Sequence, residues 1–436
     1  MSQHSTVALV LAGGVGSRLY PLTADRAKPA VPFGGKYRII DFTLSNCLHS
    51  GIRRILVLTQ YKSHSLQMHL RDGWSIYNPG IGEYVTPVPP QQRTGESWYA
   101  GTADAVYQNL YLLERSEAER VLVLSGDHIY RMDYAAMLDF CVANSSTVAV
   151  ACMRVPLEAA SGFGIMSIDE SDRVTKFEEK PSHPTPIPND PKRALASMGI
   201  YVFDRRLLCR LLREDHEDPN SSHDFGRDII PRLVQEQDVY AYAFGSDRGR
   251  VRKDRYWRDV GTIDAYYEAN MDLLKTNPPL DLYQQDWPIH TAALQGPPAR
   301  TVPGSSGRMS EVENVIFGSG SLVRGASVRH SILSRGVSIE ERASVKHSIL
   351  LDGVKVGAGA RLKNCIIDKH VDIPPHEEIG YNTARDRERF TVSPTGIVVV
   401  PRQFDFSGVA ADYNEGDETA TLGETVPQRT RVAPAT

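Results

Sequence analysis

The chain has 436 residues, of which 41% are apolar and 23% are charged, and its formal net charge is −4. This length predicts two or three domains of a globular protein rather than one core. The acidic balance argues against a broad nucleic-acid surface. No apolar run reaches the roughly 18 residues that a membrane helix needs. Without an apolar signal segment, and with five scattered cysteines and no Cys-x-x-Cys, the chain is expected to be cytoplasmic with reduced thiols.

The first predicted element is a buried strand over residues 7–11, followed by Gly13, Gly14 and Gly16. Glycines let backbone N–H groups approach an anion closely, and Arg18 adds a guanidinium that suits phosphate geometry. The spacing fits neither the dinucleotide fingerprint, whose third glycine is Leu19 here, nor the Gly-Lys-Ser/Thr ending of an ATPase loop. We therefore predict a phosphate-binding loop of another kind, with an ordinary glycine-rich turn as the alternative. Lys28, shortly after this loop, is a second cation for the same anion.

Strands and helices alternate through the next two hundred or so residues, an order typical of α/β folds. The β-branched runs 55–59, 121–124 and 148–152 predict strands, and helical periodicity covers 104–114 and 134–144. This order predicts a mainly parallel sheet with helices on both faces. Such sheets bind ligands at the carboxyl ends of their strands. The glycine loop and the segment 125–127 both directly follow a predicted strand.

The C-terminal part contains a Pro-rich linker and then an internal repeat. Residues 276–310 hold six prolines and little periodicity. Residues 327–343, 344–360 and 361–377 align without gaps at a period of 17, and 310–326 is a degenerate fourth copy. Aliphatic residues at recurring positions of such a repeat predict a parallel β-helix whose coils bury them against one another. The polar segment 403–436 is predicted to be a disordered tail.

Several strings along the chain resemble those of one enzyme family. Gly-Gly-x-Gly-Ser-Arg-Leu followed by Ala-Lys-Pro resembles the signature of sugar-nucleotide pyrophosphorylases. Together with residues 98–106, 125–130, 177–181, 196–201, 221–226 and 256–262, it closely resembles the glucose-1-phosphate adenylyltransferases, or ADP-glucose pyrophosphorylases. The resemblance runs from about residue 7 to residue 402. It implies a Rossmann-like nucleotidyltransferase catalytic domain over 1–275, the linker 276–310, and a left-handed β-helix over 311–402 for oligomerisation and regulation.

The resemblance also implies a reaction. ATP and glucose 1-phosphate would give ADP-glucose and pyrophosphate by in-line attack at the α-phosphorus, the committed step of glycogen synthesis. Because the attacking phosphate is already ionised, positioning and electrostatic stabilisation would supply most of the acceleration, with Mg²⁺ as Lewis acid. The family's properties further imply a homotetramer with an unidentified small-molecule effector, and neither nucleic acid nor membrane as a partner.

The site residues are those that match the family's motifs. Arg18, Lys28 and Asp127 are expected to be catalytic, and Asp127 and Asp259 to hold the metal. The nucleotide would be bound by Ala12, Gly13, Gly14, Gly16, Gln91, Gln92, Tyr99, Gly101 and Thr102. The sugar phosphate would be bound by Gly164, Glu179, Lys180, Ser197 and Asp224. From the sequence alone, Asp127 could equally be a helix N-cap and Asp259 a loop carboxylate.

The chain departs from the family at two positions linked to regulation. Val15 stands where many bacterial members have arginine, and Asp25 stands where enteric members have a lysine that binds a sugar-bisphosphate activator. Asp25 would repel such an anion. Arg26, Lys36, Arg38 and Arg402 remain as a candidate effector site.

Other functions stay open at this stage. The chain could use UTP or dTTP, or mannose 1-phosphate, in the same chemistry. A bifunctional uridylyltransferase with acetyltransferase activity would need more β-helix coils than the repeat provides. A non-catalytic regulatory subunit with the same fold is a further alternative, since fold alone does not define activity.

Overall fold

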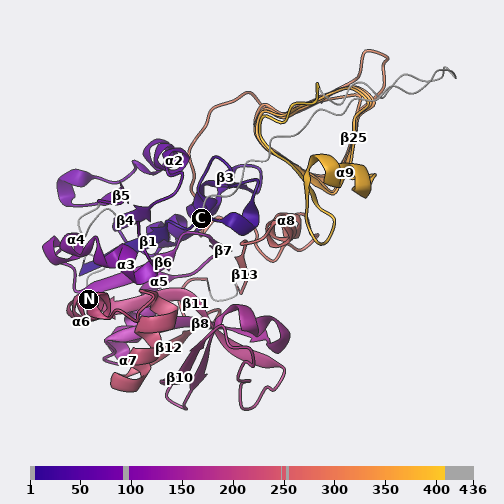
Figure 1. Cartoon of the computed structure of the whole chain (residues 1–436). Coiled ribbons are helices and arrows are strands. Elements are labelled where there is room, and N and C mark those ends of the chain that lie inside the picture. Colours follow the sequence, from indigo (N-terminus) through magenta and orange to yellow (C-terminus); the bar gives the residue numbers. More distant parts are fainter. Residues whose placement is uncertain (1–4, 92–97, 247, 252–254, 408–436) are drawn as a thin grey trace, which may run out of the picture. The chain divides into compact units, whose positions relative to one another are not determined.

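The computed structural model describes residues 5–91, 98–246, 248–251 and 255–407. Its first part is an α/β fold built on a nine-stranded sheet (Figure 1). The strands of this sheet are β1 (Thr6–Ala12), β4 (Arg54–Thr59), β5 (Tyr84–Val88), β6 (Arg120–Ser125), β8 (Val148–Pro156), β9 (Gly164–Ile168), β10 (Val174–Glu179), β11 (Arg193–Asp204) and β12 (Val239–Ala243). The four strands that we predicted are all present, longer by one to four residues.

The sheet is mixed, with parallel pairs around β1, antiparallel pairs around β11, and β12 paired in parallel with β8. Strand β1 pairs in parallel with β4 and β6, and β4 pairs in parallel with β5. The long strand β11 pairs antiparallel with β6, β8 and β9, and β9 forms an antiparallel pair with β10. The prediction of an α/β sheet is confirmed, but its antiparallel pairs were not predicted, because β9, β10 and β11 follow one another without crossover helices.

Helices cover both faces of this sheet, as the alternation predicts. They are α1 (Ile39–His49), α2 (His64–Trp74), α3 (Thr102–Tyr107), α4 (Leu110–Arg115), α5 (Tyr134–Ala143), α6 (Arg205–Glu217) and α7 (Ile230–Glu236). Helix α8 (Ile263–Asp272) follows and belongs to a separate buried cluster. Successive residues of β1 point to opposite faces, so Val7 and Leu9 join one buried cluster and Ala8 and Val10 the other. Within the described part of the chain, no helix is long and apolar enough to cross a membrane.

The helix that we predicted over 104–114 is divided into α3 and α4. Asn109 lies between them, and its side-chain Nδ2 donates to the Ala105 carbonyl (2.8 Å) and to the Tyr99 hydroxyl (2.9 Å). An asparagine side chain that competes for backbone partners interrupts a helix in this way. The break has a consequence for the site, because it fixes Tyr99 against the start of α4.

Residues 276–299 have no regular structure but are fastened to the α/β part. Trp287 is 1% exposed, and its indole nitrogen donates to Asn46 Oδ1 (3.0 Å). Thr291 donates to the buried carboxylate of Asp41 (2.6 Å). The predicted linker also contains strand β14 (Arg300–Val302), which pairs with β16 (Leu322–Arg324) and so begins the next part.

The second part is a parallel β-helix. Its further strands are β15 (Glu311–Phe317), β17 (Ser327–Leu333), β18 (Ser338–Ile339), β19 (Ser344–Lys346), β20 (Ile349–Leu350), β21 (Lys355–Val356), β22 (Arg361–Lys363), β23 (Cys365–Ile367), β24 (Asp372–Ile373) and β25 (Glu378–Ile379). Helix α9 (Thr383–Arg389), β26 (Thr391–Val392) and β27 (Val398–Val400) follow. Ile332 pairs with Ile349 and Ile349 with Ile366, which confirms the 17-residue register.

The degenerate first copy differs from the prediction by one residue. Glu311 pairs with Ser327, a separation one shorter than the period, whereas our alignment placed Ser310 opposite Ser327. The coil corners explain the repeat physically, because each is turned by residues with positive φ. Glycine, asparagine and histidine recur there, with one arginine: Asn314, His330, His347 and Asn364 lie at one corner, Gly320, Gly336, Gly353 and His370 at the second, and Gly325, Arg342, Gly359 and His376 at the third.

The β-helix and the α/β part share one buried cluster. Leu273, directly after α8, belongs to the same buried cluster as Ile332 and Ile349 of the β-helix. Arg26 donates to Asp368 at 2.8 Å, and the two side chains are only 5% and 3% exposed. The two parts therefore belong to one unit, Met1–Gln403.

Candidate active site

The glycine loop leaves the carboxyl end of β1 and lines a cavity of about 640 Å³. Gly16 has φ 65°, and a Cβ there would lie 3.1 Å from Thr23 and 3.2 Å from the Lys28 side chain. Gly14 has open space where a side chain would stand. The loop therefore needs glycine at position 16 for its turn and keeps its backbone accessible at position 14.

Two cations flank this loop. Arg18 is exposed and lines the cavity. Lys28 is buried, at 7% exposure, and its ammonium lies 2.8 Å from Asp127 Oδ2 and 3.0 Å from Asp259 Oδ1. Lys28 thus bridges the two carboxylates that we predicted as metal ligands.

The two carboxylates meet because of a short antiparallel pair outside the main sheet. Asp127 directly precedes β7 (His128–Tyr130), and Asp259 ends β13 (Trp257–Asp259). In this pair Asp259 lies opposite His128. Ligand atoms of Asp127, His128 and Asp259 all lie within 4.8 Å of one another. Two carboxylates at this spacing are hard oxygen donors of the kind that Mg²⁺ prefers.

Charge and burial keep this cluster in one ionisation state. Burial alone would raise the pKa of Asp127, but Lys28, His128 and the hydrogen bond from Ser125 together lower it well below its usual range. Burial likewise opposes the charge on Lys28, yet Asp127 and Asp259 raise the pKa of its ammonium. Burial lowers the pKa of His128 despite the neighbouring carboxylates. These shifts favour the charged forms of Lys28 and Asp127, whereas burial disfavours the charged form of the adjacent imidazole.

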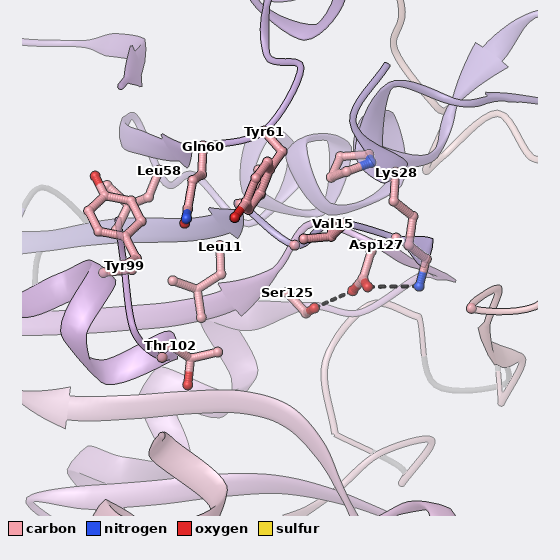
Figure 2. Close-up of a pocket in the computed structure, with 18 of the residues that line it drawn as sticks. Leu11, Val15, Lys28, Leu58, Gln60, Tyr61, Tyr99, Thr102, Ser125 and Asp127 are labelled. Carbon is pink, nitrogen blue, oxygen red and sulfur yellow. Dashed lines mark hydrogen bonds and ion pairs between the residues drawn. The ribbon is translucent and has the colours of Figure 1, made fainter. Parts of the chain in front are cut away.

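The remaining walls of the first cavity suit a nucleotide. Figure 2 shows Tyr99 and Gln60 on one side of the cavity and Lys28 with Asp127 on the other. An aromatic ring and an amide can pack against and hydrogen-bond a base, while the cationic side suits phosphates. The structure brings nearly all of our predicted nucleotide residues to this cavity: Ala12, Gly13, Gly14, Gly16, Tyr99, Gly101 and Thr102.

The two predicted glutamines do not join them. Gln91 is exposed, and its amide donates to the Pro89 carbonyl (2.8 Å) rather than lining the cavity. Gln92 lies outside the described residues. Gln60 and Tyr61 line the cavity instead and were missed by our sequence reasoning. They directly follow β4, so the rule that ligands bind at carboxyl ends of strands could have found them.

A second cavity of about 480 Å³ lies beside the first and contains all five residues that we predicted for the sugar phosphate: Gly164, Glu179, Lys180, Ser197 and Asp224. Arg18, Thr102 and Asp224 line both cavities. Asp127 lines the first cavity and Asp259 the second. The carboxylate pair therefore stands where the two cavities meet. Tyr201 and Trp257 also line the second cavity, and our sequence reasoning did not assign them.

Two glycines make room for the carboxylate of Glu179. A Cβ at Gly164 or at Gly226 would lie 2.8 Å or 2.7 Å from its Oε2 atom, so both glycines make room for this carboxylate. Burial raises the pKa of Glu179, and the nearby Lys180 ammonium, 3.4 Å away, opposes that rise. Lys180 itself has φ 46°, a left-handed conformation that is uncommon outside glycine.

The candidate effector residues are in different environments. Arg26 is buried against Asp368, and Arg38 donates to the carbonyls of Ala30 and Ser65. Lys36 and Arg402 are exposed. Arg26 and Arg38 therefore already serve as structural donors, and an anion would have to compete with these protein partners for them.

The site consists of two adjoining cavities, with cations and a pair of carboxylates where they meet and an aromatic side chain in the wall of the first. This geometry suits the transfer of a nucleotidyl group. Residues 7–276 match the family described as nucleotidyl transferase, and residues 297–400 match the C-terminal hexapeptide family described as GlmU-like. The first match covers more than half of the chain, so the fold and the site define a member of that class.

Individual relatives narrow the class. The chain is similar to glucose-1-phosphate adenylyltransferase 2 of Vibrio vulnificus (62% identity, covering 92% of this chain and 99% of the relative) and of Vibrio cholerae (59%, covering 93% and 99%). It is 50% identical to the glucose-1-phosphate adenylyltransferase of Methylobacillus flagellatus, covering 91% of this chain and 93% of the relative. The chain belongs to the glucose-1-phosphate adenylyltransferase family.

Proposed function

We propose that this chain transfers AMP from ATP to α-D-glucose 1-phosphate, giving ADP-glucose and pyrophosphate, and so supplies glycogen synthesis. The observation that carries this proposal is the position of Asp127, Lys28 and Asp259 where a base-sized cavity adjoins a sugar-sized one. The adjoining cavities would position the two anionic substrates next to each other, and the charged groups between the cavities, with the metal that they would hold, would offset the repulsion between the substrates.

The protein's own residues would orient the reacting groups. Tyr99 and Gln60 would hold the base, and the glycine loop with Arg18 the phosphates of ATP. Lys180 would neutralise the phosphate of glucose 1-phosphate, and Glu179 would accept hydrogen bonds from sugar hydroxyls. Because no proton has to be removed from an ionised phosphate, His128 has no role as a base. Asp127 and Asp259 would hold Mg²⁺, which when bound supplies Lewis-acid stabilisation of phosphate charge.

The proposal extends to assembly and regulation. The β-helix would join four copies of the chain, and a phosphorylated or carboxylate metabolite would act as an effector. The five cysteines are free and buried, in keeping with a cytoplasmic enzyme whose thiols stay reduced. Analytical ultracentrifugation that gives a monomer at micromolar concentration would contradict the tetramer.

The decisive experiment measures pyrophosphate release with ATP, UTP, dTTP or GTP, each combined with glucose 1-phosphate or mannose 1-phosphate. We expect turnover only with ATP and glucose 1-phosphate, and loss of turnover when a chelator removes divalent metal. Turnover with another pair would show that the enzyme uses a different nucleotide or a different sugar phosphate. No turnover with any pair, even with candidate effectors present, would favour a regulatory subunit.

A further inference from the structure

The two cavities share a wall that is made of two chain segments, here called the nucleotide loop (residues 98–104) and the sugar loop (residues 221–226). Thr102 of the first segment and Asp224 of the second line both cavities. The segments are far apart in the sequence and are joined by backbone and side-chain hydrogen bonds. A rigid wall between two ligand sites can transmit the state of one site to the other.

The backbones of the two loops are in direct contact. The carbonyl of His223 accepts the N–H groups of Ala103 (2.8 Å) and Asp104 (3.3 Å) at the start of α3. Gly101 lies so close that a Cβ there would stand 2.2 Å from this same carbonyl oxygen. Only glycine fits at position 101, and the sugar loop therefore supplies the hydrogen-bond acceptor for the first turn of a helix that begins in the nucleotide loop.

His223 is kept in place by its own side chain. Its backbone is left-handed, with φ 56°. Its Nδ1 atom lies 2.9 Å from the carboxylate of Asp215, which is 6% exposed in α6. Ser221 donates to the other oxygen of Asp215 (2.6 Å) and accepts the His223 N–H (2.9 Å). These contacts hold the His223 carbonyl toward the nucleotide loop.

A side-chain link runs parallel to the backbone link. The Thr102 hydroxyl donates to Asp224 Oδ2 (2.9 Å) and accepts the Phe225 N–H (3.0 Å). The other oxygen of Asp224 accepts the N–H groups of Gly226 and Arg227 (2.9 and 3.1 Å). Asp224 is thus oriented from the nucleotide side by one hydroxyl and from the sugar side by two amides.

We propose that Thr102 and His223 are positioning residues that couple the two substrate pockets, so that a nucleotide in the first pocket raises the affinity of the second for the sugar phosphate. The proposal rests on the assignment of ATP and glucose 1-phosphate to these cavities. A coupling of this kind is reciprocal, because each ligand must raise the affinity for the other by the same factor.

The test is a calorimetric titration of glucose 1-phosphate into the full-length protein with Mg²⁺, with and without the α,β-methylene analogue of ATP. The methylene group replaces the oxygen whose bond to the α-phosphorus breaks, so no turnover occurs. We expect the analogue to lower the Kd of glucose 1-phosphate about fivefold or more. Thr102→Val, which keeps the shape and removes the hydroxyl, should reduce that factor to less than about twofold.

Two further variants separate positioning from folding. His223→Gly removes the ring and its contact with Asp215 while glycine tolerates the left-handed backbone, and it should also lose the coupling. Thr102→Ser, which keeps the hydroxyl, should retain it. The matched control is His376→Gly, the same change at φ 63° on the β-helix, which should leave coupling and turnover unchanged. Thermal unfolding of each variant shows whether it is folded.

Three outcomes overturn the proposal. The analogue could leave the Kd of glucose 1-phosphate unchanged in the unmodified protein. Thr102→Val and His223→Gly could retain the full factor. Both variants could weaken each substrate alone as much as they weaken the coupling, which would show only a structural role. Failure of the proposed function is distinct, since the unmodified protein would then release no pyrophosphate from ATP and glucose 1-phosphate.

Discussion

At the scale of single residues, the site is organised around Lys28. Its ammonium is the shared partner of Asp127 and Asp259, and each carboxylate is held by at least one further contact or strand pairing. A buried cation between two anions tolerates the loss of one partner better than an isolated pair does, because the second partner remains. Chemistry and folding can therefore be separated by substitution here.

Asp127→Asn should lower kcat by at least about 100-fold, since it removes one of two carboxylates that would hold the metal. The fold should survive, because Lys28 keeps Asp259 at 3.0 Å. Steady-state pyrophosphate release and thermal unfolding check both parts, with the exposed Asp72→Asn as control. An unchanged kcat would show that the metal assignment is wrong.

The pH dependence should reveal Glu179, whose pKa burial raises above the ordinary value for glutamate. As the pH falls, this carboxylate is protonated earlier than an ordinary one and stops accepting hydrogen bonds from the sugar. The value of kcat/KM for glucose 1-phosphate should therefore decline on the acidic side. Glu179→Gln should lower kcat/KM by about 10- to 100-fold at neutral pH.

The phosphate of the substrate also titrates, with a pKa of about 6, so the comparison must use matched profiles. Glu179→Gln should retain the phosphate ionisation and lose the glutamate contribution. If the profiles of the variant and of the unmodified protein have the same shape, Glu179 does not contact the sugar in its ionised form.

At the scale of elements, the β7–β13 pair brings the carboxylates together, and the β-helix coils stabilise one another by stacking. Each coil buries its aliphatic residues only against neighbouring coils. Ile349, 1% exposed, lies between Ile332 and Ile366 in the parallel ladder. A smaller side chain at this position would therefore remove packing contacts in its own coil and with the coils on both sides.

Ile349→Ala should lower the free energy of unfolding by about 2–5 kcal/mol, from lost burial and the cavity left behind. Lys355→Ala on the same coil is the control. Its side chain is 66% exposed, and the change should stay within about 0.5 kcal/mol. Urea unfolding followed by circular dichroism measures both. Equal midpoints for the two variants would contradict the stacked core.

At the scale of the whole molecule, a buried ion pair joins the α/β part to the β-helix. Arg26 lies two residues before Lys28, and its partner Asp368 follows β23 of the β-helix. Removal of one partner from such a pair leaves an uncompensated buried charge, whereas removal of both can be nearly neutral. This makes the pair a direct probe of how the parts are joined.

Arg26→Met or Asp368→Leu alone should lower stability by about 3–5 kcal/mol, and the double variant should recover most of that loss. The midpoint of urea unfolding, measured for all four proteins, gives the coupling between the two positions. Additive losses in the double variant would show that the two side chains do not interact energetically.

The sequence by itself determined the local structure and the class of chemistry. Alternating apolar runs placed β1, β4, β6 and β8 within a few residues, and the 17-residue period identified the β-helix and its register. These features depend on neighbours along the chain, whose periodicity is visible in any sequence. The motifs around Arg18, Asp127, Glu179 and Asp259 likewise identified residues that line the two cavities.

Only the tertiary structure decided how distant segments meet. It paired β7 with β13, so that Asp127 and Asp259 became neighbours, and it placed the Lys28 ammonium between them. It placed Gln60 rather than the predicted Gln91 in the wall of the first cavity, and it buried Arg26 against Asp368. Such contacts join segments that carry no periodic relation to each other, and they are selected by packing and charge in the folded chain rather than by local propensity.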